Sequence, residues 1–187
     1  MVQATQAHTP PMKSSNESTQ EQLQFAKQQG DALGKTLDYM THKEAHGAEV
    51  AAGEYLVAYA VENAEGMYRM SGGKLEWHNP QQENAHIEVS VRDGADGRFV
   101  PALEVFVTLI DANGKEVGMH QQPFLWHPWL YHYGRNWIVP GDGEYTLRVH
   151  IEPPIFARHD KENGLRYTEP VTIEFKLAKI KTGQKLN

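Results

Sequence analysis

Short stretches that alternate apolar and polar residues, each followed by a turn sequence, make up most of the second half of this chain. Residues 85–92 (AHIEVSVR) place Ile87, Val89 and Val91 on one face of a strand and polar side chains on the other. Residues 144–152 (EYTLRVHIE) repeat the pattern, and turn sequences such as DGADG, DANG and PGDG separate these stretches. About seven such strands with almost no helix predict an all-β fold, an immunoglobulin-like antiparallel β-sandwich.

The remaining apolar stretches fit the same fold. Residues 54–62 (EYLVAYAVE) are almost wholly apolar, as in a strand buried on both faces, and residues 67–70 begin the expected return strand. In the last predicted strand, residues 171–177, we expect Phe175 and Leu177 to point inward. The predicted core, which the tryptophans help to fill, comprises Ile87, Val89, Val91, Leu147, Val149 and Phe175.

The N-terminal part of the chain differs in composition from the rest. Its first residues are rich in Gln, Ser, Thr, Pro and Asn with few large apolar side chains, which predicts a poorly ordered tail. Residues 20–46 contain more helix formers, but Gly30 and Gly34 interrupt the apolar spacing, so we expect a weak helix there. The chain therefore divides into an N-terminal arm (1–47), disordered to weakly helical, and a β-sandwich domain (48–187).

The overall composition excludes several classes of function. The net charge of −6 argues against nucleic acid as a partner, because binding phosphates requires a basic face. The chain has no cysteine, which leaves any metal to histidine, methionine and carboxylate side chains. No apolar run reaches membrane-spanning length, and G-x-S-x-G, H-E-x-x-H, Walker and Rossmann glycine patterns are absent. Nothing in the sequence therefore indicates an enzyme.

Histidines concentrate in the segment 119–154, together with three of the four tryptophans. Upstream, His86 and Glu88 share one strand face about 7 Å apart, so they can converge on one cation or point into solvent. Spacing alone favours solvent, since a single histidine is more often solvated or hydrogen-bonded than a ligand. Several imidazoles with a carboxylate and a thioether together favour a metal site, for copper or alternatively manganese or ferrous iron. The candidate ligands are His86, Glu88, Met119, His127, His132, His150 and His159.

From His86 to about Ile180 the sequence resembles the periplasmic ferrous-iron transport accessory proteins of bacteria. The matching elements are the strand motif at 86–88 (HIE), the HYG motif at 132–134, the HIEPP motif at 150–154, Arg158-His159 and the closing strand at 171–177. The resemblance implies an immunoglobulin-like domain with a copper site and a homodimer in which one site can draw residues from both subunits. It also implies a periplasmic protein that acts beside an inner-membrane iron permease.

Carried over from the family, the implied ligands are His86, Glu88, His132 and the loop histidine His159. The family also uses a methionine seven positions before the HYG histidine, and here that position is Leu125. His127 or Met119 would take its place, and an imidazole there would favour Cu(II), Mn(II) or Fe(II) over Cu(I). Protonation of the imidazoles below about pH 6 should weaken binding, because metal ligands must be deprotonated.

The leading interpretation is a metal-binding protein, for copper and/or iron, that assists high-affinity iron uptake. One alternative is a β-sandwich interaction protein whose histidines only pack and hydrogen-bond, with the N-terminal arm binding a partner. Another is a copper-dependent, ferroxidase-like protein. No signal peptide follows Met1, so we expect a periplasmic protein if a leader has been removed, and a cytoplasmic one if Met1 is the native start.

Overall fold

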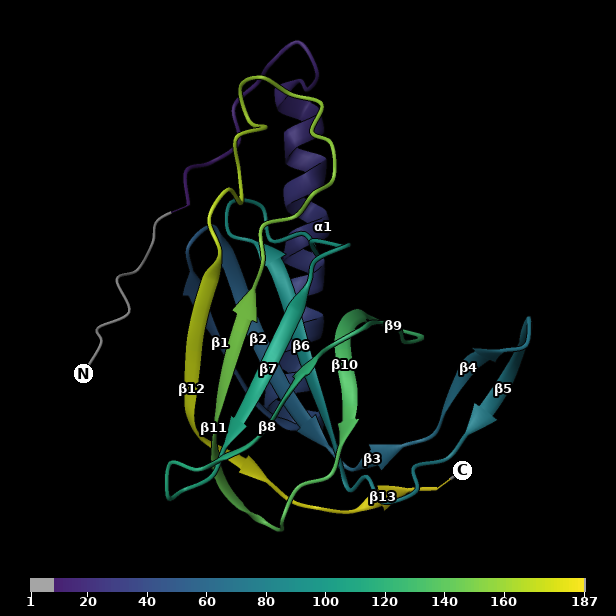
Figure 1. Ribbon diagram of the computed structural model, residues 1–187. Helices are drawn as coiled ribbons and strands as arrows, with labels where there is room; N and C mark the ends of the chain where they lie inside the picture. Colours follow the sequence, from purple (N-terminus) through teal and green to yellow (C-terminus); the bar gives the residue numbers. More distant parts are fainter. Residues whose placement is uncertain (1–8, 187) are drawn as a thin grey trace.

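Two antiparallel sheets packed face to face form the body of the computed structural model, which describes residues 9–186 (Figure 1). The first sheet contains, in spatial order, β1 (His46–Ala52), β2 (Tyr55–Glu62), β6 (Ala85–Asp93), β10 (Tyr131–Trp137) and β9 (Phe124–Trp126). The second contains β12 (Val171–Ile180), β11 (Gly143–Ile151), β7 (Val105–Ile110) and β8 (Glu116–Gln121). The predicted β-sandwich is confirmed.

The core lies between the two sheets, as the alternating pattern predicted. All six predicted core residues are buried, and Phe175 is the most exposed of them at 7%. The hairpin predicted around the DANG turn forms between β7 and β8. Of the tryptophans, only Trp137 is buried, whereas the other three expose 39% or more of their surface. The segment 119–154 therefore contributes one tryptophan, Trp137, to the core, and its other two tryptophans lie at the surface.

Strand β6 is buried on both faces, including the polar face that the sequence placed towards solvent. The reason is an additional layer outside the first sheet. Ala60, which lies opposite Glu88 in the register of β2 and β6, packs against Met40 and Leu130 in a second apolar cluster. His86 and Glu88 are both buried, so the solvent-facing interpretation of this pair is wrong.

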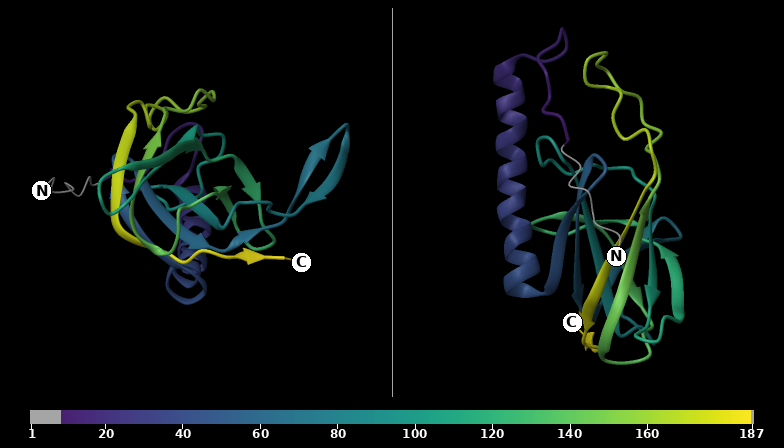
Figure 2. Two further views of the ribbon diagram at one scale, coloured as in Figure 1. Left: turned by 60° about the horizontal axis from the view of Figure 1, so that its bottom comes forward. Right: turned by 90° about the vertical axis from the view of Figure 1, so that its left-hand side faces the viewer.

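Helix α1 (Gln20–Tyr39) supplies most of this outer layer and stands along one side of the sandwich (Figure 2). A capping box starts the helix, in which Thr19 and Gln22 bond each other's backbone N–H groups. The π-helical turn η1 (Met40–Glu44) follows it. Gly30 permits close contact with the turn after β6, because a Cβ there would lie 1.8 Å from the carbonyl oxygen of Asp96. The glycines predicted to interrupt the helix thus bring it against the sheet.

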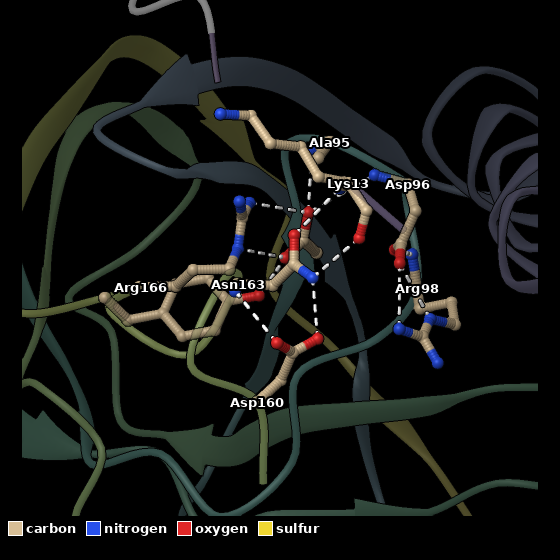
Figure 3. A network of polar contacts seen from close by, with 9 residues as sticks. Lys13, Ala95, Asp96, Arg98, Asp160, Asn163 and Arg166 are labelled. Atoms are coloured by element: carbon tan, nitrogen blue, oxygen red, sulfur yellow. Dashed lines mark hydrogen bonds and ion pairs between the residues drawn. The ribbon is translucent and has the colours of Figure 1, made fainter. Parts of the chain in front are cut away.

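Residues 9–19 have no regular secondary structure but contact the long loop between β11 and β12. The side-chain amide of Asn163 exchanges hydrogen bonds with the backbone of Lys13, at 2.8 and 2.9 Å (Figure 3). Ser15 donates to Asp160 at 2.8 Å. The tail that we expected to be poorly ordered therefore makes defined contacts from residue 9 onward, and residues 1–8 lie outside the described range.

The same loop is anchored to the end of β6. Arg166 donates to both carboxylate oxygens of Asp93, at 3.2 and 3.1 Å, and the Tyr167 hydroxyl also contacts this carboxylate. Tyr167 stacks on Tyr55 with 4.8 Å between the ring centroids. Buried, charge-assisted bonds of this kind hold a loop in one position more firmly than exposed pairs do.

Two strand predictions differ from the structure. The expected return strand does not pair with β2, because β4 (Met67–Ser71) and β5 (Lys74–His78) form a separate hairpin that projects from the body (Figure 1). Leu177 is 70% exposed with φ +59°, because a register shift between β11 and β12 breaks the inside–outside alternation, and Ala178 is buried instead. A short parallel pair, β3 (Ala64–Glu65) with β13 (Gln184–Lys185), ties the C-terminal segment to the base of the hairpin.

Among the described residues, no helix has the length and apolar character needed to cross a bilayer.

Candidate metal centre

His86, Glu88 and His132 converge on one point of the first sheet. His86 and Glu88 come from β6 and His132 from the neighbouring β10. The pairing of Gly134 with Glu88 places all three side chains on the same face of the sheet. One ligand atom from each lies within 4.8 Å of the others. Glu88 Oε1 is 3.6 Å from His86 Nε2 and 3.3 Å from His132 Nε2.

These separations suit a shared cation. Metal–ligand bonds of about 2.0–2.2 Å at a tetrahedral angle place two ligand atoms about 3.4 Å apart. His86 Nε2 and both ring nitrogens of His132 are buried and have no hydrogen-bond partner among the described residues. A buried polar atom without a partner is costly, and a cation at the shared point would satisfy the two Nε2 atoms, one on each ring.

Burial keeps both imidazoles neutral. Removal from water, together with the neighbouring His86 and His127, lowers the pKa of His132 from 6.5 to about 3. Burial likewise lowers the pKa of His86, against the opposing effects of Glu65 and Asn136. Because a proton on a ring nitrogen would block its lone pair, neutral rings are the form that binds metals. At neutral pH the site is therefore ready for a cation, and the expected loss of binding below pH 6 moves to more acidic pH.

Gly134 keeps the space between the two imidazoles open. A Cβ at this position would lie 3.0 Å from His132 Cδ2 and 3.1 Å from His86 Nε2. The same Cβ would lie 3.1 Å from Leu125 Cδ1. Any larger residue would thus crowd the two imidazoles that would hold a metal ion, which gives a physical reason for the glycine of the HYG motif.

Asn136 orients His86 and was not among the predicted residues. Its side-chain oxygen lies 2.8 Å from His86 Nδ1, so Nδ1 carries the proton and Nε2 turns its lone pair towards the cluster. Asn136 pairs with His86 in the register of β10 and β6. The sequence signal was its position two residues after Gly134, which places it on the same strand face.

Glu65 was also missed, because its segment reads as a turn. Its carboxylate oxygen Oε1 lies 4.0 Å from His86 Nε2, and its side chain is 20% exposed. Asn136 holds the Glu65 backbone on both sides, accepting from its N–H at 3.3 Å and donating to its carbonyl at 2.7 Å. The backbone of Glu65 is therefore fixed, and its side chain places a second carboxylate at the edge of the cluster.

His127 lies beside the cluster but outside the three converging residues. Its ring centroid is 6.2 Å from that of His132, and its buried Nδ1 has no hydrogen-bond partner in the described part of the chain. Leu125 lies opposite His132 in the register of β9 and β10. An apolar side chain thus occupies the place where the family resemblance implies a thioether, with an imidazole nearby.

The other three predicted ligands lie elsewhere in the chain. Met119 is 55% exposed on β8. His150 bonds to Thr172 at 2.7 Å and to Glu152 at 3.1 Å. His159 has a 96% exposed side chain and lies 3.5 Å from the Glu17 carboxylate. Within one chain, the structure does not bring these residues to the cluster.

An antiparallel β-sandwich that holds two neutral imidazoles and a carboxylate around one buried point defines a class of metal-binding protein. Comparison with known protein families narrows this class to one family, because the model of the Fe2+ transport protein family matches residues 37–179. The chain belongs to this family, and the resemblance drawn from the sequence is confirmed. UPF0423 proteins of Brucella abortus and Brucella suis are 31% identical over 155 residues, covering 74% of this chain and 79% of theirs.

Solved structures share the fold. FetP of uropathogenic Escherichia coli strain F11 superposes with a TM-score of 0.58 at 22% identity, over 73% of this chain and 94% of that one. Copper-reconstituted P19 of Campylobacter jejuni gives 0.59 at 19% identity, over 74% and 96% of the two chains. At this level of identity the likeness confirms the β-sandwich alone.

Proposed function

We propose that His86, Glu88 and His132 bind a copper ion, and that the protein handles metal during bacterial iron uptake. The observation that carries this proposal is the buried, neutral pair of imidazoles whose nitrogens face a carboxylate at 3.3–3.6 Å. His86 turns the lone pair of Nε2 towards the Glu88 carboxylate, and a cation between them would relieve this repulsion. Membership of the Fe2+ transport family and the copper-bound FetP and P19 structures support copper as the bound ion and iron as the cargo.

The donor set fits copper in its divalent state. Imidazole nitrogen and carboxylate oxygen suit Cu(II), whereas the thioether that would stabilise Cu(I) is replaced by Leu125. His127, next to His132, offers a further imidazole from the same segment. When bound, copper supplies a redox-active cation. The role of the protein is to keep the imidazoles neutral, orient His86 through Asn136 and exclude water from the site.

We further propose a homodimer in which His159 completes the site of the second copy. The loop that carries His159 is anchored at Asp93 and projects away from the cluster of its own chain, and the side chain itself is 96% exposed. A histidine presented in this way can reach another molecule without moving the loop. The periplasm and an inner-membrane iron permease remain the expected location and partner, and FetP, which was recombinantly expressed in the periplasm of E. coli, is consistent with that location.

Copper titration of protein without a histidine tag tests the proposed site. Wild type should bind one copper per chain. His86→Ala and His132→Ala should each lower the copper affinity at least tenfold, which is the size of effect seen when residues of metal sites are altered. His42→Ala and His150→Ala are the controls, since these histidines lie outside the cluster. Equal binding by all four variants would show that surface histidines, not the cluster, hold the metal.

A further inference from the structure

Glu65 connects the buried cluster with solvent. The side chains of His86, His132 and Glu88 are 0%, 3% and 7% exposed, whereas that of Glu65 is 20% exposed. One of its oxygens, Oε1, faces His86 Nε2 at 4.0 Å. A cation that moves from water into the cluster along this side therefore meets the Glu65 carboxylate before it meets the imidazoles.

The second oxygen of Glu65 has a different neighbour. Oε2 lies 3.9 Å from the ammonium group of Lys185. Lys185 pairs with Glu65 in the parallel register of β13 and β3, which lie side by side at the base of the hairpin (Figure 1). The carboxylate thus lies between the imidazole of His86 on one side and the exposed ammonium group of Lys185 on the other.

Charge balance indicates that Glu65 would compensate the second positive charge of a divalent ion. Glu88 neutralises a monovalent ion such as Cu(I), but a divalent ion leaves one positive charge in the buried cluster. An uncompensated buried charge is strongly unfavourable, so a second carboxylate is worth far more to a divalent ion than to Cu(I). Carboxylate oxygen is also the donor that Mn2+ and Fe2+ prefer.

We propose that Glu65 is a fourth protein ligand, which receives divalent cations from solvent and makes the site select them over Cu(I). Glu65 lies outside the three residues whose ligand atoms are within 4.8 Å of one another, so it closes onto the metal by a side-chain rotation. Lys185 holds the carboxylate when no metal is present. This inference rests on the proposed metal site and adds the residue that sets its preference.

The test compares one divalent and one monovalent probe. Mn2+ serves as an air-stable divalent ion, whose free concentration is read from its electron paramagnetic resonance signal, and Cu(I) is measured anaerobically against a chromophoric chelator. Glu65→Gln should weaken Mn2+ binding by at least tenfold and change Cu(I) binding by less than twofold. Lys185→Met should strengthen Mn2+ binding severalfold, because the competing cation is removed.

Two further variants distinguish ligation from a general electrostatic effect. Glu62→Gln removes the same charge from β2, opposite His86 in the register, and should leave Mn2+ binding within twofold of wild type. Glu65→Asp retains the charge but shortens the side chain, so Mn2+ binding should weaken even though the field is unchanged. Thermal unfolding confirms that each variant is folded.

The outcomes separate this inference from the proposed function. If wild type binds neither probe, or binds both as well after His86→Ala, the proposed site itself is wrong. If His86→Ala abolishes binding while Glu65→Gln binds Mn2+ as wild type does, only the role of Glu65 is overturned. An equal loss in Glu62→Gln and Glu65→Gln, or an equal loss of Mn2+ and Cu(I) in Glu65→Gln, would also overturn it.

Discussion

His132 shows how the environment of one residue couples metal binding to stability. Its pKa is 6.5 in an exposed chain and about 3 in the fold, because burial disfavours the charged ring. Between these values the unfolded chain binds a proton that the folded chain does not. Stability of the metal-free protein is therefore full above about pH 6.5 and falls as the pH decreases towards 3. The lowered pKa of His86 acts in the same direction.

Metal-free protein should accordingly lose roughly 2 kcal/mol of unfolding free energy between pH 7 and pH 5 through His132 alone. Urea unfolding at the two pH values measures this loss. A His132→Gln variant, which cannot take up the proton, should show a correspondingly smaller difference. If the wild type and the variant depend on pH equally, His132 is not the buried neutral group that the structure places there.

Gly134 provides the second test at the residue scale. Gly134→Ala places a methyl group 3.0–3.1 Å from the two imidazoles, so copper binding should weaken at least tenfold while the fold persists at a cost of about 1–3 kcal/mol. Gly141→Ala is the matched control, because nothing lies within 4 Å of its Cβ position. Copper affinity that is the same in both variants would contradict the role assigned to this glycine.

At the scale of single elements, the sequence predicted the positions of the strands better than the packing of other segments over their outer faces. Alternation placed the core faces of β6 and β11 correctly, because it depends only on neighbours along the strand. It failed at Leu177, where pairing between strands shifts by one residue, and at His86, whose polar face is buried against residues distant in the sequence, such as Glu65 and Asn136. Both failures come from long-range packing, which local periodicity does not contain.

Helix α1 offers a prediction that separates helix propensity from packing. Gly30→Ala should destabilise the protein by about 1–3 kcal/mol or more, because the new Cβ meets the Asp96 backbone. Gly34→Ala should change stability by no more than about 1 kcal/mol, because its Cβ would meet only the end of the Arg92 side chain, at 3.2 Å, and alanine favours the helix. Chemical denaturation of the two variants measures both values. Equal effects would show that the helix does not approach the sheet at Gly30.

For the whole molecule, the candidate site was partly predictable. The family motifs pointed to His86, Glu88 and His132, which the fold brings together, whereas Asn136 and Glu65 depend on strand register and a short parallel pair. His159, implied by the same motifs, lies on an anchored loop away from the cluster of its own chain. The proposed homodimer accounts for this position.

Mixing two defective chains tests that homodimer. His86→Ala and His159→Ala should each bind copper weakly, but co-refolded together they should recover about a quarter of the wild-type sites. The fraction follows because half of randomly formed dimers are mixed, and each mixed dimer holds one intact site. Copper per chain after gel filtration gives the readout. A mixture that binds no more than the mean of the separate variants would exclude sharing of the site between subunits.

The most direct test of the central claim is to locate copper in crystals of the copper-loaded protein, by anomalous diffraction at the copper absorption edge. We predict one strong peak per chain, about 2.0–2.2 Å from His86 Nε2, His132 Nε2 and a carboxylate oxygen of Glu88. A peak at His150 and Glu152, or at other surface histidines with the cluster empty, would contradict the account.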